Sequence, residues 1–135
     1  MITHFNVPAT LITGAGASRE LAPQLARLGA RRVLFVTDAF MESSGAAGGF
    51  VRTLEEAGLA VALFAGVQPD PTDVNVRDGL AQFRTNTCEV IVALGGGSPI
   101  DAAKAIAVLT TNPEPLSLYQ GYHKVPRAGA PLVVI

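Results

Sequence analysis

Three consecutive glycines, Gly95, Gly96 and Gly97, are the residues of this sequence whose type and position most clearly indicate chemistry. They follow a continuous apolar run, residues 90–94, which is typical of a strand buried on both faces of a parallel sheet. Because glycine has no Cβ, it lets a backbone turn tightly and approach a ligand closely. The pattern therefore predicts a strand followed by a turn that can lie against a ligand.

A helix is predicted directly after these glycines. We predict Ser98 as its N-cap, Pro99 as its first residue and Asp101 as the acidic partner of a capping box. Free backbone N–H groups and the positive end of the helix dipole converge at such a helix start. The stretch therefore has the local plan of a phosphate-binding site.

Two aspartates follow other predicted strands. Asp38 comes directly after the apolar run 32–37, and Asp70 lies in a proline-rich turn after the run 59–65. In an open parallel sheet, ligands bind beyond the carboxyl ends of the strands, where these aspartates and the glycine turn all fall. An acidic residue there accepts ribose hydroxyls and disfavours a 2′-phosphate, so Asp38 indicates NAD over NADP. The alternative is a simple helix or turn cap, but the glycine turn favours the nucleotide interpretation.

A second glycine pair, Gly14 and Gly16, is an alternative candidate for the phosphate-binding turn. It lies between a strand predicted over the apolar stretch 9–13 and a predicted helix, but Arg19 stands where the third glycine of G-x-G-x-x-G belongs. A tight turn is the favoured interpretation of this pair. The motif G-x-x-x-x-G-K-[ST] occurs nowhere in the sequence, which disfavours an ATPase or GTPase.

No residue is assigned a catalytic or a metal-binding role. His4 and His123 belong to no cluster with ligand spacing, and Cys88 precedes a strand as a small core residue would. Lys104 stands three residues after Asp101, which favours a local charge pair. The sequence therefore offers residues that could bind a ligand but none to which a catalytic role is assigned.

Alternating strands and helices position these residues. Helices are predicted over residues 18–28, closed by Gly29, over 50–57, and from Thr72 or Asp73 onward with Val76, Leu80 and Phe83 on one face. Residues 111–124 are expected to be irregular, and a last strand begins near Pro131. This order predicts an α/β fold, a doubly wound, mostly parallel Rossmann-like sheet with helices on both faces.

Composition narrows the class of protein. Of the 135 residues, 49% are hydrophobic and 16% charged, and the net charge is −1 without a basic run. Nucleic acid and anionic membranes are therefore not expected as partners. No apolar stretch approaches the ~20 residues of a membrane span, and one cysteine fits a reducing compartment. We expect a cytoplasmic protein.

The apolar, β-branched residues 131–135 predict a buried strand at the end of the chain. We expect residues 1–135 to be one dinucleotide-binding domain, cut inside a strand of a longer protein.

Several motifs together resemble the iron-containing, or group III, alcohol dehydrogenase family. The string G-G-G-S-P-I-D-A-A-K-A-I-A of residues 95–107 resembles its cofactor-binding motif. Residues 5–17 resemble its opening, 34–41 its second strand, 66–72 its proline-rich turn and 131–135 the strand before its threonine-rich cofactor loop.

The resemblance implies roles for individual residues. Asp38 would bind the adenosine ribose, and the glycine turn with Ser98 would bind the pyrophosphate of NAD. Asp101 would cap the loop, and Asp70 would face the nicotinamide end of the cleft. Gly14 and Gly16 would serve only the first turn of the fold.

The resemblance also implies what this chain does not contain. Members of the family carry a helical C-terminal domain in which one aspartate and three histidines bind Fe²⁺ or Zn²⁺. The expected activity is hydride transfer between a small alcohol or aldehyde and NAD, and a homodimer is expected by resemblance. The alternatives are a fragment of an enzyme like glycerol dehydrogenase or dehydroquinate synthase, or a non-catalytic nucleotide-binding or oligomerisation module.

Overall fold

A four-stranded parallel sheet forms the centre of the molecule, in the order β2-β1-β3-β4. The computed structural model describes residues 10–135. The strands are β1 (Arg32–Asp38), β2 (Ala60–Val67), β3 (Val90–Ala93) and β4 (Leu132–Val134). The chain places β2 on one side of β1 and then crosses to place β3 on the other side. The direction of winding therefore reverses between β1 and β3, and in such sheets this point is where ligands bind.

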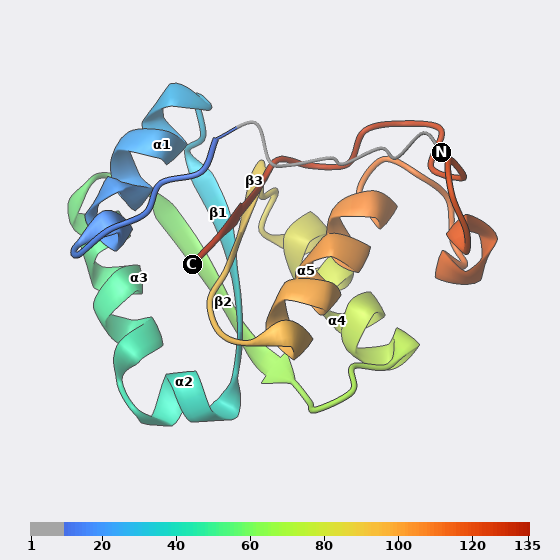
Figure 1. Ribbon diagram of the computed structural model, residues 1–135, viewed down its shortest axis with the longest axis horizontal. Coiled ribbons are helices and arrows are strands. Elements are labelled where there is room, and N and C mark those ends of the chain that lie inside the picture. Colours follow the sequence, from blue (N-terminus) through green and yellow to red (C-terminus); the bar gives the residue numbers. More distant parts are fainter. Residues whose placement is uncertain (1–9) are drawn as a thin grey trace, which may run out of the picture.

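Helices cover both faces of this sheet, as the alternation of elements predicts. They are α1 (Leu21–Arg27), α2 (Ala39–Ser43), α3 (Ala46–Glu56), α4 (Asp73–Thr85) and α5 (Gly97–Leu109), with short 3₁₀ turns at Ala17–Glu20 and Leu116–Tyr119. Figure 1 shows α1, α2 and α3 on one side of the sheet and α4 and α5 on the other. The predicted doubly wound α/β fold is confirmed.

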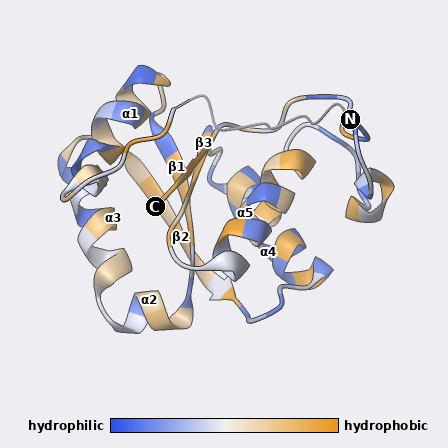
Figure 2. Cartoon of the chain, in the orientation of Figure 1, coloured by the Kyte–Doolittle hydropathy of each residue, from blue (hydrophilic) through white to orange (hydrophobic). Residues whose placement is uncertain are grey.

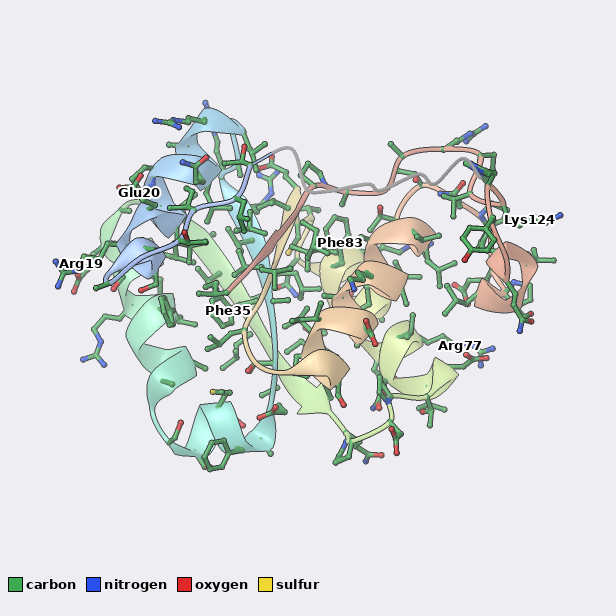
Figure 3. All side chains as sticks on the ribbon, viewed as in Figure 1. Arg19, Glu20, Phe35, Arg77, Phe83 and Lys124 are labelled. Carbon is green, nitrogen blue, oxygen red and sulfur yellow. The ribbon has the colours of Figure 1, made fainter. Side chains whose placement is uncertain are left out.

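Alternate residues of β1 supply the two cores. Val33 and Phe35 pack with α1 and α3, whereas Leu34 and Val36 pack with α4 and α5. The ring of Phe35 stacks on Phe50 of α3 with 6.4 Å between centroids. The strands are correspondingly apolar in Figure 2, and Figure 3 shows Phe35 inside the molecule while Arg19 and Arg77 project outward. A strand buried on both faces requires a continuous apolar run, which β1 and β3 have.

The first predicted helix agrees with the structure. A 3₁₀ turn leads into α1, and the chain leaves the helix at Gly29, whose φ is +69°. The N–H of Gly29 donates to Ala26 O and that of Ala30 to Leu25 O, which satisfies carbonyl groups at the helix end. Glycine is the residue that adopts this left-handed conformation without strain.

Two predictions about local structure in the first half of the chain are wrong. Residues 10–13 form no strand, and Leu11 and Ile12 are 79% and 40% exposed. None of the four strands among the described residues pairs with them. Residue 9 lies outside the described residues. The helix predicted over 50–57 begins at Ala46, because Gly45 makes the turn alone with a φ of +82°, and Gly48 and Gly49 lie inside the helix.

A membrane-spanning helix is not found among residues 10–135, since none of their helices is both long and apolar enough.

Candidate functional site

The ends of β1 and β3 lie side by side and carry Asp38 and the glycine turn. The two strands pair in parallel from Val33 with Val90 to Val36 with Ala93. Beyond that pairing the N–H of Leu94 donates to Val36 O at 3.0 Å. Both segments therefore leave the sheet at its carboxyl edge, at the point where the winding reverses.

Asp38 has two different tasks for its two carboxylate oxygens. Its backbone is extended at the N-cap position of α2, and Oδ1 accepts a hydrogen bond from the N–H of Met41 at 2.9 Å. Oδ2 lies on the side of the glycine turn, 3.5 Å from where a Cβ of Gly95 would stand. The interpretation of Asp38 as a helix cap is confirmed, and the cap leaves one oxygen facing the turn.

The glycine turn combines one crowded position with two open ones. Gly95 has a φ of +133°, and a Cβ there would lie 3.0 Å from Cγ of Pro99. At Gly96 and Gly97 an added Cβ meets no described atom within 4 Å. The backbone of these two residues is thus open on the side where a side chain would otherwise stand. A turn of this kind fits an extended anion such as a pyrophosphate.

The helix after the turn begins earlier than the sequence predicts. Gly96 is the N-cap of α5 and Gly97 its first residue, so Ser98 is not the cap and Pro99 is the third helical residue. The positive φ of Gly95 completes the change of direction at once, which lets the helix start two residues sooner. The N–H groups of Gly97 and Ser98 stand in the first turn, where no acceptor within the helix is available.

Asp101 does not form the predicted capping box. Its Oδ1 instead accepts a hydrogen bond from Nζ of Lys104 at 3.2 Å, and both side chains are exposed. With the helix starting at Gly97, Asp101 stands in its second turn, past the N–H groups that it would have to cap. The local charge pair is the interpretation that the structure confirms.

Asp70 lies in the exposed loop after β2, the neighbour of β1, and has a φ of +54°. The buried side chain of Asn75 on α4 holds the start of this loop. Its Nδ2 donates to Gly66 O at 3.1 Å, and its Oδ1 accepts from the N–H of Gln68 at 3.5 Å. Asp70 therefore lies at the same edge of the sheet as Asp38, one strand away.

Sequence reasoning missed two residues that shape this edge, Asn75 and Thr37. Thr37 is fully buried at the end of β1, and its Oγ1 donates to Leu94 O at 2.9 Å. For Thr37 the available signal was a polar side chain at the end of a buried strand, and for Asn75 it was a polar side chain beside Val76 on the buried face of a helix. Buried polar side chains are hydrogen-bonded in proteins, but the sequence does not identify their partners.

The second glycine pair and Cys88 have the structural roles that were favoured for them. Gly14 and Gly16 form a tight turn in which Gly14 O accepts from the N–H of Ala17 at 3.1 Å. Cys88 is a core residue, and burial raises the pKa of its thiol. His123 is exposed in the irregular segment, and His4 lies outside the described residues. Within residues 10–135, no group of three or more His, Cys, Asp or Glu side chains could hold a metal ion.

An open hollow of about 370 Å³ lies elsewhere on the surface. It is lined by residues of α1 and by the segments that lead into β1 and β2, including Ala30 and Leu59. Those segments are at the amino ends of the parallel strands. The hollow is therefore at the opposite edge of the sheet from Asp38 and is made mostly of small apolar side chains.

The family model described as iron-containing alcohol dehydrogenase matches residues 8–135. The chain belongs to this family. This confirms the family that residues 95–107 and the accompanying motifs predict. The Rossmann-like architecture of residues 10–135 is confirmed as well.

Individual relatives of this iron-containing alcohol dehydrogenase chain agree with that assignment. The NAD-dependent methanol dehydrogenase of Bacillus methanolicus is 39% identical over 99% of the chain and 35% of its own length. A structure of a 1,3-propanediol oxidoreductase superposes with a TM-score of 0.94 at 37% identity, covering 99% of this chain and 35% of that one. The structure of a sulfoacetaldehyde reductase from Bifidobacterium kashiwanohense in complex with NAD⁺ superposes with a TM-score of 0.85 at 29% identity. The match covers 99% of this chain and 35% of that one. The chain thus spans about 35% of the length of these relatives.

Proposed function

We propose that this chain is the NAD-binding part of an NAD-dependent, metal-containing alcohol dehydrogenase. The observation that carries the proposal is Oδ2 of Asp38, which has no hydrogen-bond partner among residues 10–135 and lies beside the open glycine turn where the winding of the sheet reverses. Membership of the iron-containing alcohol dehydrogenase family supports the assignment of that site to NAD.

Each residue of the site has a task that its geometry suits. Oδ2 of Asp38 accepts the hydroxyls of the adenosine ribose, and its negative charge repels a 2′-phosphate. The N–H groups of Gly97 and Ser98 donate to the pyrophosphate at the start of the 13-residue helix α5, whose dipole favours the negative charge. Asp70 lies toward the nicotinamide end of the cleft.

The reaction itself is proposed for the whole protein. NAD, when bound, supplies the acceptor for a hydride from a small alcohol, and the reverse reaction reduces an aldehyde. The Fe²⁺ or Zn²⁺ site belongs to a C-terminal part beyond this chain, so the 135-residue chain holds the cofactor without turnover. Substrate then binds against the nicotinamide end of the site built here.

The partners and compartment proposed for the protein rest on its composition, and the homodimer rests on its resemblance to the family. A net charge of −1 without a basic run favours a small-molecule substrate over nucleic acid or an anionic membrane. We place the protein in the cytoplasm, as a homodimer.

A titration with NADH tests the cofactor site. The 135-residue chain is compared with Gly97→Ala, whose methyl group enters the open space over the turn, by following NADH fluorescence. Gly49→Ala is the matched control, because Gly49 is also a helical glycine with open space around its Cβ position, but lies in α3. We expect the unaltered chain and Gly49→Ala to bind NADH equally and Gly97→Ala to bind at least about tenfold more weakly, the loss of one or more charge-assisted hydrogen bonds.

Thermal unfolding of the same variants separates binding from folding. Neither alanine should destabilise the chain, since each replaces glycine in a helix without a clash. Equal NADH affinity of all three proteins would remove the glycine turn from the site. Oxidation of an alcohol by the 135-residue chain alone would contradict the proposed division between cofactor binding and chemistry.

A further inference from the structure

The carboxyl ends of β1 and β3 are joined by a side-chain hydrogen bond in addition to the backbone ladder. Oγ1 of Thr37 donates to the backbone oxygen of Leu94 at 2.9 Å. Thr37 is the residue before Asp38, and Leu94 is the residue before Gly95. The bond therefore connects the two segments at the last position before each enters the candidate site.

Burial makes this bond a strong constraint. As whole residues Thr37 is 0% exposed and Leu94 8% exposed, and the hydrogen bond between them is buried, so water competes little for it. A buried carbonyl that loses its donor carries the full cost of desolvation, which favours the bonded arrangement. Valine has nearly the shape of threonine but cannot donate, so it would leave Leu94 O without this partner.

The regular pairing of the strands ends just before this position. The paired residues of β1 and β3 end with Val36 and Ala93. Beyond them one backbone hydrogen bond still joins the two segments, from the N–H of Leu94 to Val36 O at 3.0 Å, while the N–H of Gly95 reaches Ile135 O on β4's side at 3.4 Å. β1 also has an irregularity in its register with β2 between Val36 and Asp38. At Thr37 the backbone thus departs from regular sheet geometry just where Asp38 and the glycine turn must be held together.

We propose that Thr37 is a positioning residue for the cofactor site. Its hydroxyl fixes the carbonyl of Leu94, and thereby sets the separation between Oδ2 of Asp38 and the backbone of Gly96 and Gly97. Ribose and pyrophosphate are joined in one ligand, so these two groups bind it together only at one separation. The inference rests on the proposed function in that the ligand is a dinucleotide.

Substitutions at Thr37 test the proposal on the 135-residue chain. Thr37→Val removes the hydroxyl at nearly constant volume, and Thr37→Ser restores it. Thr53→Val is the matched control, because Oγ1 of Thr53 also donates to a backbone oxygen, that of Gly49 at 3.0 Å, but at an exposed position of α3. Two quantities are measured for each protein: NADH affinity by fluorescence titration, and amide hydrogen exchange at the turn by NMR, followed at Leu94 and Gly95, whose N–H groups donate to Val36 O and Ile135 O.

We expect Thr37→Val to bind NADH about tenfold more weakly, the effect of one buried hydrogen bond, and to exchange the amides of Leu94 and Gly95 faster. Thr37→Ser and Thr53→Val should match the unaltered chain in both measurements. Unchanged affinity or unchanged exchange at the turn in Thr37→Val would overturn the positioning role. Failure of the unaltered chain to bind NADH would instead refute the proposed function, and the exchange measurement would still decide whether Thr37 holds the turn.

Discussion

Asp38 shows how one carboxylate serves both the fold and a ligand. Oδ1 caps α2 through the N–H of Met41, and Oδ2 faces the turn at Gly95. The two functions that the sequence left as alternatives, cap and ribose acceptor, are therefore compatible in geometry. They are also separable by mutation, because asparagine is as good an N-cap as aspartate but carries no charge.

Replacement of Asp38 by asparagine should thus change cofactor preference while leaving stability nearly intact. We expect NADH affinity to fall about tenfold, since hydrogen bonds to a charged acceptor are roughly twice as strong as neutral ones. NADPH should lose less, because the charge that repels its 2′-phosphate is gone. Dissociation constants for both nucleotides, measured by fluorescence, check this prediction.

Asp38→Gly is the companion variant. It removes both oxygens, and glycine at an N-cap costs only a few tenths of a kcal/mol relative to aspartate. The same shift in the ratio of NADH to NADPH affinity should therefore appear. If neither variant changes that ratio, Asp38 does not bind the ribose.

At the scale of elements, β1 and β3 are tied together at both edges of the sheet. Thr37 joins them at the carboxyl edge, and Glu89 joins them at the amino edge. The carboxylate of Glu89 accepts from the backbone N–H groups of Arg31 and Arg32 at 2.7 and 3.1 Å, and pairs with the guanidinium of Arg32 at 2.8 Å. These two strands also carry the two halves of the candidate site, so their pairing is the contact on which the site depends.

Glu89 gives this pairing a dependence on pH. The hydrogen bond from the N–H of Arg31, with that from Arg32 next, lowers the pKa of Glu89 from its ordinary value of 4.5. A carboxyl whose pKa is lower in the folded state stabilises the fold above its ordinary value, and this contribution is lost as the pH falls through the folded pKa. The contribution should therefore be complete at pH 7 and decline below pH 4.5.

Urea unfolding of the unaltered chain and Glu89→Gln at pH 7, 5 and 3 measures this effect. We expect Glu89→Gln to be less stable at pH 7 and the difference to shrink at pH 3, where the glutamate of the unaltered chain is also becoming neutral. Asp101→Asn is the control, since Asp101 pairs only with exposed Lys104 on its own helix. A difference in free energy that is the same at all three pH values would show that the charge of Glu89 does not contribute.

At the scale of the whole molecule, α4 and α5 pack so closely on each other and on the sheet that a side chain at one glycine would force its neighbours to shift. A Cβ at Gly79 of α4 would lie 2.3 Å from Cδ1 of Ile106 and 3.1 Å from Cε1 of Phe64. Ile106 is fully buried, so its terminal methyl group has little room to move. Gly79 thus sets the distance between α4 and α5, and α5 carries the helix start of the site.

Alanine at Gly79 should overpack this core and lower the free energy of unfolding by about 1–3 kcal/mol, despite the better helix propensity of alanine. Gly49→Ala, in the open position on α3, should raise it by about 0.5–1 kcal/mol. Chemical denaturation of both variants measures the contrast. Equal stability of the two would mean that the contact between α4 and α5 relaxes without cost.

Local patterns in the sequence determined the class of fold and the edge on which the site lies. Continuous apolar runs predicted β1 and β3, because strands buried on both faces have no polar alternation. Asp38 and the glycine turn could be assigned to one edge, because all parallel strands end on the same side of a sheet. The family followed from the string of residues 95–107 and its companions, which is also a local pattern.

Only the tertiary structure decided that β3 lies beside β1, which brings Asp38 to Gly95. It also decided that α5 starts at Gly97 and that Asp101 binds Lys104 rather than the helix start. The hydrogen bond from Thr37 to Leu94 spans 57 residues of chain. Helix and strand periodicity reports neighbours within a few residues, whereas contacts of this range depend on the order of strands, which no local pattern records.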